Sequence, residues 1–221
     1  IVVLDQSFKN QNSVYLINTN VTRPDGYTSA NVSGCGLTLN DKTSSYQFSL
    51  AGSLSSQYDD FNHDYTLPKM GTEYSTMFSK TRGRFRFYVY RNAKNEKYEI
   101  NDLGLNFTNN EENRGTVLTW MWLKPFWKIL KANNSISIDF TNRMDSKNLT
   151  NSSFSYNFNL TTMKYFTLWG WAGHSFTETY NYYEPRVDGY YYLEPHWFAS
   201  EIGFSSNYSK PFALDGGIEY V

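Results

Sequence analysis

The first candidate for chemistry in this sequence is a histidine surrounded by carboxylates. His63 follows Asp59 and Asp60 and precedes Asp64. Carboxylate oxygens in such a cluster could bind a cation, and paired carboxylates with a histidine could imitate the site of a barrel protease. We favour a third interpretation, a solvated loop, because the whole segment 59–71 is polar.

A second candidate is the pair His174 and Ser175, which could supply two parts of the Ser-His-acid constellation of a rim-site hydrolase. Serine is abundant throughout the chain, so the match carries little weight. His174 and His196 both lie among aromatic residues near predicted strand ends, where we expect them to pack. We therefore predict no catalytic residue, no metal ion and no cofactor.

Two further groups of residues have a structural or binding interpretation. Glu184 and Arg186 flank Pro185, and we expect an ion pair between them that fixes an extended segment, since Arg binds carboxylates well. The aromatic segment 178–197 includes Tyr190 and Trp197, which we name as candidate ligand contacts because aromatic faces stack on sugar rings. Loop stability and contact with a protein partner explain these aromatics equally well.

The run Asn101-Asp102-Leu103-Gly104 predicts a defined turn. Asn and Asp side chains bond to their own backbone, and Gly accepts a positive φ. Asn101, Asp102 and Gly104 are therefore candidate structural residues of a plug or rim element.

The elements that must position these residues are strands. In SSFSYNFNLT, residues 152–161, large apolar residues alternate with small polar ones, which is the period of a strand with one apolar face. A hairpin is predicted to turn near Thr81-Arg82-Gly83 and another at Lys124-Pro125, because Pro cannot donate in a ladder. About twelve strands follow from this rhythm, in the segments 1–9, 13–23, 28–40, 45–58, the two arms of 72–92, 116–130, 134–142, the hairpin of SFSYNFNL and MKYFTLWGWAG, and the last two strands after 195. Segment 178–195 is predicted as a loop or extension.

Composition agrees with an all-β protein. Of the 221 residues, 19% are aromatic, and the mean hydropathy is nonetheless −0.59 because Asn, Ser and Thr are abundant. No apolar run approaches the roughly 18 residues of a membrane helix. The net charge of −1 makes nucleic acid an unsuitable partner. The one cysteine, Cys35, excludes an internal disulfide, and we expect it to be a small packed residue.

The orientation of the apolar faces decides the class of protein. The predicted strands run about nine to fourteen residues, the length that a tilted strand needs to cross a bilayer. The other face carries polar and charged residues such as Arg84, Arg86 and Asp139. Trp residues near strand ends, Trp169 and Trp171 among them, resemble the aromatic belts of membrane barrels. The alternative is a soluble, secreted sandwich or barrel with the apolar faces turned inward.

A family resemblance follows from several short motifs. KTRGRFRF at 80–87, the run at 101–104, Glu184-Pro185-Arg186 and NYSKPFAL at 207–214 resemble, in order and spacing, the C-terminal barrel of a domain-of-unknown-function family of Bacteroidota outer-membrane proteins. The resemblance implies an outer-membrane β-barrel that usually follows a sandwich similar to carbohydrate-binding module family 9. We expect residues 1–221 to hold the barrel without that sandwich, as a mature or partial chain that starts at Ile1.

We therefore expect an all-β protein, an antiparallel transmembrane β-barrel of about 12 or more strands, with one domain over 1–221. The expected location is the bacterial outer membrane, and the expected partners are its lipids, protein subunits of an envelope complex, and glycans. The expected function is non-enzymatic, either an accessory subunit for protein export, assembly or glycan uptake, or a channel. The alternatives are the membrane anchor of a surface glycan-binding protein and, more weakly, a rim-site hydrolase.

Overall fold

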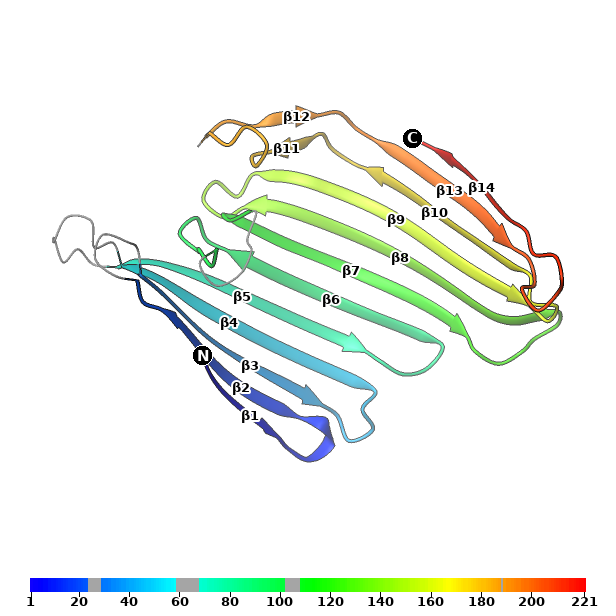
Figure 1. Ribbon diagram of the computed structural model, residues 1–221, viewed down its shortest axis with the longest axis horizontal. Coiled ribbons are helices and arrows are strands. Elements are labelled where there is room, and N and C mark those ends of the chain that lie inside the picture. Colours follow the sequence, from blue (N-terminus) through cyan, green and yellow to red (C-terminus); the bar gives the residue numbers. More distant parts are fainter. Residues whose placement is uncertain (24–28, 59–67, 102–107, 188) are drawn as a thin grey trace. The chain divides into compact units, whose positions relative to one another are not determined.

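The computed structural model describes residues 1–23, 29–58, 68–101, 108–187 and 189–221, and nearly all of its regular structure is β (Figure 1). The elements are β1 (Val2–Ser7), the 3-10 turn η1 (Lys9–Gln11), β2 (Ser13–Val21), β3 (Ser29–Asn40), β4 (Tyr46–Tyr58), β5 (Lys69–Lys80), β6 (Phe85–Lys94), β7 (Glu111–Trp122), β8 (Ile129–Arg143), β9 (Leu149–Thr162), β10 (Thr167–Ser175), β11 (Thr179–Asn181), β12 (Tyr192–Glu194), β13 (Phe198–Ser205) and β14 (Asp215–Tyr220).

Twelve of these strands form one antiparallel sheet in the order β1 to β10, then β13 and β14. β11 and β12 form a separate two-stranded sheet. Each strand of the large sheet therefore pairs with its neighbours in sequence, apart from the β11–β12 insertion. The prediction of an all-β chain with about twelve strands joined by hairpins is confirmed.

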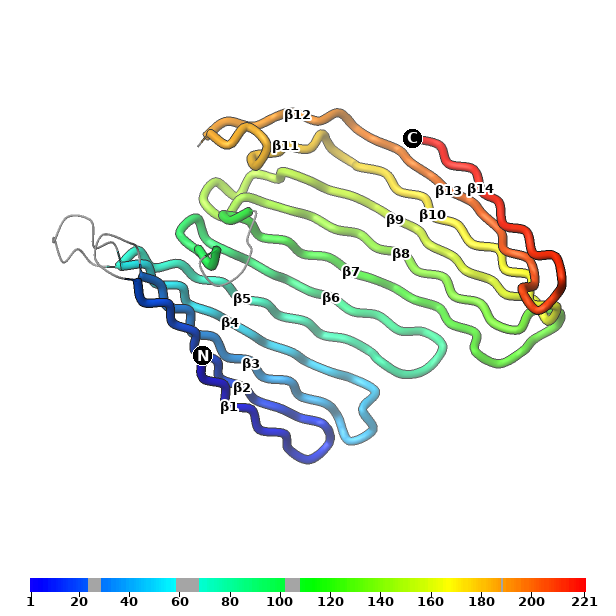
Figure 2. Tube along the Cα trace, viewed as in Figure 1, coloured from blue at the N-terminus to red at the C-terminus, as the bar shows by residue number. Residues whose placement is uncertain are grey.

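The hairpin connections lie at the two ends of the sheet (Figure 2). One end carries the connections 8–12, 41–45, 81–84, 123–128, 163–166 and 206–214, most of which are short. The opposite end carries the others, most of which are longer, apart from the turn 144–148; the segment 176–197 there includes β11 and β12. The predicted turn at 81–83 is confirmed, and Gly83 accepts its φ of +91° without a side-chain clash.

Several predicted boundaries differ from the structure. Residues 129–143 form the single strand β8, where the sequence suggested that one strand ends at 130 and another begins at 134. The turn before it spans 123–128 and is closed by paired backbone hydrogen bonds of 2.9 Å between Phe126 and Ile129. The opening strand stops at Ser7, before η1.

The chain divides into two compact units. Unit 1 comprises Ile1–Ser79, Tyr90–Arg114 and Thr141–Leu149, and unit 2 comprises Lys80–Val89, Gly115–Phe140 and Thr150–Val221.

Cross-strand pairing in unit 1 collects large apolar side chains on one face. Leu4 lies opposite Leu16, and Leu37 lies opposite Leu50. Directly opposed residues share a face, as do residues two apart along a strand. The apolar face of unit 1 therefore carries Val2, Leu4, Val14, Leu16, Cys35, Leu37, Leu39, Phe48 and Leu50, beside a hydrogen-bonded cluster of Asn18, Asn31 and Ser33. Cys35 is exposed there, which corrects the prediction of a packed residue.

Unit 2 has the same construction. Phe158 lies opposite Gly170, which in turn lies opposite Ile202, and Ile202 lies opposite Ile218. A side chain at Gly170 would collide with the Phe158 ring, so this ring covers the glycine. The apolar face of unit 2 carries Phe154, Tyr156, Phe158, Leu160, Leu168, Phe198, Ile202, Phe204, Ile218 and Tyr220.

Burial in both units is inverted relative to a water-soluble protein. Leu16 is 53% exposed and Ile218 is 72% exposed, whereas Ser55 and Ser175 are 1% and 0% exposed. Among the described residues, the buried apolar side chains are mostly small: Ala30, Ala93, Tyr98, Ile129, Ala132 and Ala199. Soluble proteins rarely expose contiguous apolar surface on this scale. Within the described ranges, no helix has the length and apolar character to cross a membrane.

Candidate functional site

The face of unit 2 opposite the apolar one combines polar and aromatic side chains. Asn157 lies opposite Trp171, and Trp171 lies opposite Glu201. Asn159 lies opposite Trp169 in the same way. We call this side the polar face of unit 2, and on β9, β10, β13 and β14 it also carries Thr161, Thr167, Gly203, Ser205, Asp215 and Glu219.

β8 contributes to the same polar face. The hydroxyls of Ser137 and Ser155 are 2.7 Å apart, and Ser155 is two residues from Asn157 on β9. Residues of β8 that alternate with Ser137, such as Asn133 and Lys131, therefore share this face. The Tyr156 hydroxyl donates to Asn134 Oδ1 at 2.7 Å on the other face, as the alternation requires.

Trp169 is held flat on the polar face by a glycine. A Cβ at Gly203, its partner on β13, would collide with the indole of Trp169, so the ring lies where that side chain would stand. Gly173 is covered in the same manner by Trp171 and Trp197, whose rings stack at 6.2 Å with an interplanar angle of 16°. The glycines thus fix the tilt of two indoles in β10.

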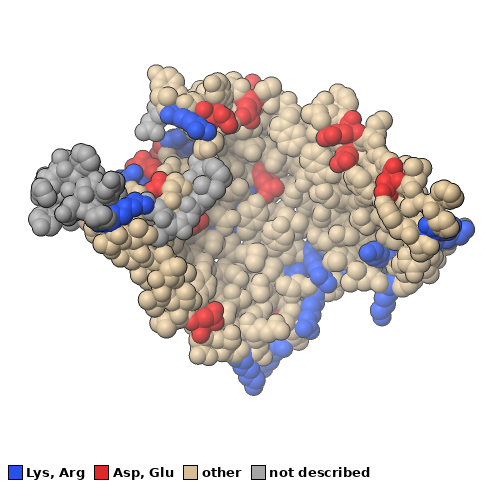
Figure 3. Space-filling view, in the orientation of Figure 1, with Lys and Arg blue, Asp and Glu red and all other residues tan. Residues whose placement is uncertain are grey.

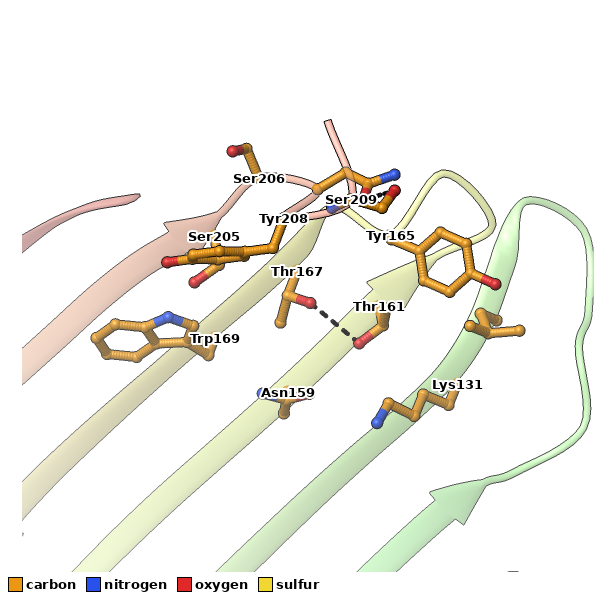
Figure 4. A pocket seen from close by; sticks show the side chains of 12 residues that line it. Lys131, Asn159, Thr161, Tyr165, Thr167, Trp169, Ser205, Ser206, Tyr208 and Ser209 are labelled. Atoms are coloured by element: carbon orange, nitrogen blue, oxygen red, sulfur yellow. Dashed lines mark hydrogen bonds between the residues drawn. The ribbon is translucent and has the colours of Figure 1, made fainter. Parts of the chain in front are cut away.

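Three hollows of about 690, 580 and 400 Å³ adjoin Trp169. We call them together the Trp169 groove. Figure 4 shows the largest hollow, with Trp169, Asn159, Thr161, Thr167 and Lys131 around it. The Thr161 and Thr167 hydroxyls are 3.2 Å apart and bond to each other across β9 and β10.

The amides of the groove have no partner among the described residues. Asn133, Asn157 and Asn159 are exposed, and none of the hydrogen bonds in the described part of the chain uses their side chains. The carboxylate of Glu201, which lines two of the hollows, likewise has no hydrogen-bond partner in the described part of the chain. These groups are therefore free to bond to a ligand.

The connection between β13 and β14 forms the end wall of the groove. Tyr208 donates its hydroxyl proton to Asp215, and the Leu214 N–H donates to Ser206 Oγ at 2.6 Å. Asn207 Nδ2 donates to the Lys164 carbonyl at 3.1 Å, which ties this loop to the β9–β10 turn. The segment 206–214 is therefore held both by hydrogen bonds within the β13–β14 hairpin and by one hydrogen bond to the β9–β10 turn.

Charge is distributed unevenly in unit 2. Its turns at 81–84, 123–128, 163–166 and 206–214 carry cationic residues, and Figure 3 shows Lys and Arg side chains gathered along turn ends of the visible face. The residues concerned are Arg82, Arg84, Lys124, Lys128, Lys164 and Lys210. The Trp169 groove differs from these turns, because it combines Lys131 with the carboxylates of Glu201, Asp215 and Glu219.

The aromatic candidates Tyr190 and Trp197 do not come together. Tyr190 is exposed and its N–H donates to the Val187 carbonyl at 3.1 Å. Trp197 stacks on Trp171 at the edge of the polar face, and its carbonyl accepts the Ser175 N–H at 3.0 Å. Trp197 is therefore near the groove, while Tyr190 belongs to the β11–β12 connection.

Glu184 and Arg186 are both exposed, and no ion pair joins them in the described part of the chain. The Arg186 guanidinium instead lies over the Tyr183 ring, 5.6 Å from its centroid. The Glu184 N–H donates to Asn181 Oδ1 at 3.2 Å. The expected ion pair is corrected to a cation–π contact and a side-chain-capped turn, which leaves the structural role of the segment intact.

Other sequence candidates fall partly outside the described residues. Asp102, Gly104 and the cluster around His63 lie there. Asn101 is described and exposed, and its N–H donates to Glu99 Oε1 at 2.7 Å. No three His, Cys, Asp or Glu side chains in the described ranges are grouped so that they could hold a metal ion.

His174 and Ser175 cannot act as a base and a nucleophile toward each other. Adjacent residues of β10 point to opposite faces, and Ser175 is fully buried with its Oγ accepting the Trp197 N–H at 2.9 Å. His174 Nδ1 lies 3.0 Å from the Trp197 carbonyl, and its ring packs edge-on against Phe176. The expectation that His174 packs among aromatics is confirmed.

Unit 1 contains a second organised polar region that the sequence did not indicate. The Tyr98 side chain is buried against the polar face of β4 and β5, where its hydroxyl is 2.6 Å from Ser53 Oγ. Burial, together with the nearby Glu73 carboxylate, raises the pKa of Tyr98 to about 12. Its backbone occupies the space beside Gly71 that any side chain there would need. The residues around Tyr98 are therefore folded onto β4 and β5.

Sequence reasoning missed the Trp169 groove because Trp169 and Trp171 were assigned to an interfacial belt. Both lie on the polar face in β10, so that interpretation is wrong for these two residues. The sequence of β10 holds no local signal for this placement, because it follows from the pairing of Trp169 with Asn159 and of Trp171 with Asn157 on β9.

Comparison with known families identifies the chain. The model of the family described as "Domain of unknown function (DUF5916)" matches residues 1–221, and the chain belongs to this family. No curated protein and no solved structure matches it. The resemblance to a domain-of-unknown-function family is confirmed at that level.

Proposed function

We propose that this DUF5916 chain forms the wall of a transmembrane β-barrel in the bacterial outer membrane, with the apolar faces of both units against lipid. The observation that carries the proposal is the inverted burial, in which Leu16 and Ile218 are exposed and Ser55 and Ser175 are enclosed. In lipid the exposed apolar side chains are solvated by acyl chains, whereas in water they would promote aggregation.

The strand geometry supports the same proposal. β3, β4, β5 and β7 to β9 have 12 to 15 residues, and typical soluble strands have about five or six. The connections are mostly short at one end of the sheet and mostly longer at the other, which resembles the pattern of outer-membrane barrels. A sheet in lipid must also have its backbone groups paired, and the sequential hairpin order places every strand from β2 to β10 and β13 between two neighbours.

For the activity of the barrel we propose a non-enzymatic role, as an accessory subunit of a larger envelope complex or as a channel. The enclosed Ser175 and the braced polar faces support a scaffold more than a catalyst. A second candidate, the membrane anchor of a glycan-binding protein, is favoured by one observation, the unpartnered amides around Trp169.

Cys35 gives a direct test of membrane orientation. It is the one cysteine of the chain and is exposed on the apolar face of unit 1. In phospholipid vesicles we expect it to resist a water-soluble maleimide and to give the bright emission of a lipid-exposed probe when labelled with an environment-sensitive fluorophore. The matched control is Asn157→Cys in a Cys35→Ser background, which should react with the maleimide. Equal reactivity of the two positions would refute the proposal.

The role is tested by purification from native outer membranes in mild detergent. Stoichiometric protein partners would support an accessory subunit, and a solitary protein that conducts ions in planar bilayers would support a channel. A solitary, non-conducting protein would leave the glycan-binding anchor. Absence from the membrane fraction would refute all three.

A further inference from the structure

We propose that the Trp169 groove binds an uncharged saccharide chain. This inference rests on the proposed function in one respect: the polar face of unit 2 must be the side that is turned away from lipid. It names the ligand class from three features of the groove: a fixed aromatic platform, unpartnered amides, and carboxylates without an excess of cations.

The platform is the indole of Trp169. It is pressed against Gly203 on one side, so its other side is presented to the groove in a single orientation. Sugar rings have an apolar face of C–H groups that pack against aromatic rings, and a fixed platform lowers the entropy lost on binding. Trp171, two residues along the same strand, lies on the same side and lines an adjoining hollow. Two platforms in one groove suit a chain of rings better than a single sugar.

The hydrogen-bonding groups match hydroxyls. Each of Asn133, Asn157 and Asn159 offers two N–H donors and an accepting oxygen, and a sugar hydroxyl both donates and accepts. The amides surround the platform on β8 and β9, while Glu201 faces them from β13 as an acceptor. Protein ligand sites commonly combine such an apolar surface with a few converging polar groups.

The charges of the groove favour a neutral ligand. Glu201, Glu219 and Asp215 line one hollow, and they would repel phosphate, sulfate or carboxylate groups. Lys131 lines the largest hollow, and it would repel a strongly cationic peptide. An uncharged chain of hydroxyl-bearing rings avoids both penalties and still uses the carboxylates as acceptors.

The experiment uses detergent-solubilised full chain on an array of immobilised oligosaccharides. The uncharged probes are oligomers of glucose, mannose, galactose and N-acetylglucosamine; uronic-acid oligomers and oligolysine serve as charged probes. We expect retention on at least one uncharged probe and on neither charged probe. Retention on oligolysine or uronic acid alone, or on no probe, would overturn the proposal.

Variants then locate the site. Trp169→Ala should weaken binding about tenfold or more, which corresponds to at least ~1.4 kcal/mol. Asn159→Ala should weaken it roughly two- to tenfold, as expected for one hydrogen bond, and because Asn159 is exposed this variant keeps the test valid if Trp169→Ala does not fold. Trp127→Ala is the matched control, since Trp127 is exposed in the turn 123–128 and lies outside the groove. Undiminished binding by the Trp169 and Asn159 variants would overturn the proposal.

The same samples separate this proposal from the proposed function. Cys35 labelling is measured beside the array. A shielded Cys35 without saccharide retention would reject the saccharide and leave the barrel, whereas an accessible Cys35 with retention that depends on Trp169 would reject the barrel and leave the groove.

Discussion

Replacing Ile202 with lysine tests whether the apolar face of unit 2 contacts water or lipid. Ile202 lies in β13 on the apolar face of unit 2, opposite Gly170 and Ile218, and its side chain is 47% exposed. The extra length of lysine therefore meets no packed core. Any large effect of Ile202→Lys must arise from the medium outside the sheet.

The two interpretations differ severalfold in the expected free energy of unfolding. If the apolar face contacts water, a surface substitution of this kind changes stability by about 0.5 kcal/mol or less. If the face contacts acyl chains, a lysine near the bilayer midplane of a barrel costs about 2–4 kcal/mol. That cost corresponds to roughly a 30- to 1,000-fold shift in the folding equilibrium.

The assay is reversible urea unfolding in phospholipid vesicles, followed by tryptophan fluorescence. Asn157→Lys is the matched control, because Asn157 is exposed on the polar face of the same unit. We expect Ile202→Lys to be less stable than Asn157→Lys by 2 kcal/mol or more. Two variants within 0.5 kcal/mol of each other would refute the assignment of the apolar face to lipid.

Three predictions concern unit 1. Gly71→Ala should destabilise the protein by roughly 1–3 kcal/mol, because the Tyr98 backbone fills the space of the new methyl group. Gly52→Ala is the control and should change the urea midpoint little, because a methyl group there would lie at an ordinary 3.5 Å from the Glu73 carbonyl. Burial raises the pKa of Tyr98 to about 12, so the neutral Tyr98 side chain should stabilise the fold fully below pH 10 and lose that contribution as the pH rises from 10 to 12. Ultraviolet titration of the unsubstituted chain should show one phenol that ionises late and that is absent from Tyr98→Phe. A Tyr98 phenol that titrates near pH 10 would contradict this prediction. Asp41 accepts hydrogen bonds from the Thr43 hydroxyl and from turn N–H groups, which lower its pKa to about 2. Its stabilising contribution should therefore be complete above pH 3.8 and vanish as the pH falls toward 2. Carboxyl NMR titration measures the pKa of Asp41, and Asp41→Asn should remove that part of the acid dependence of stability.

Strand positions were predictable from sequence because alternation and turn chemistry are local. The 152–161 segment lies within β9, and the turn near Thr81-Arg82-Gly83 contains the positive-φ glycine that such a turn requires. The ends of strands were less predictable. β8 runs through 130–134 without a break. Lys131, Asn133 and Asn134 all have a backbone N–H and can pair within a strand, so none of them ends it.

The groove was not predictable, since it depends on register between strands that are distant in sequence. Within β10, the large residues Trp169 and Trp171 alternate with the small residues Gly170 and Ala172. Taken alone, this alternation assigns the tryptophans to the apolar face. Pairing with β9 reverses the assignment, because Gly170 lies opposite Phe158 and Trp169 lies opposite Asn159.

The same register gives the two faces of β10 different neighbours. On the apolar face, the glycine of β10 accommodates the Phe158 ring, so the outer surface stays apolar without a side chain from β10 at that point. On the polar face, Gly203 of β13 accommodates Trp169, so the indole lies along the sheet instead of standing away from it. The two glycines are not equivalent, because a side chain at Gly203 would meet only the Trp169 ring, whereas one at Gly170 would also meet the Glu201 carbonyl of β13. A larger residue at Gly203 should therefore change the polar face alone, while one at Gly170 should also disturb the pairing of β10 with β13.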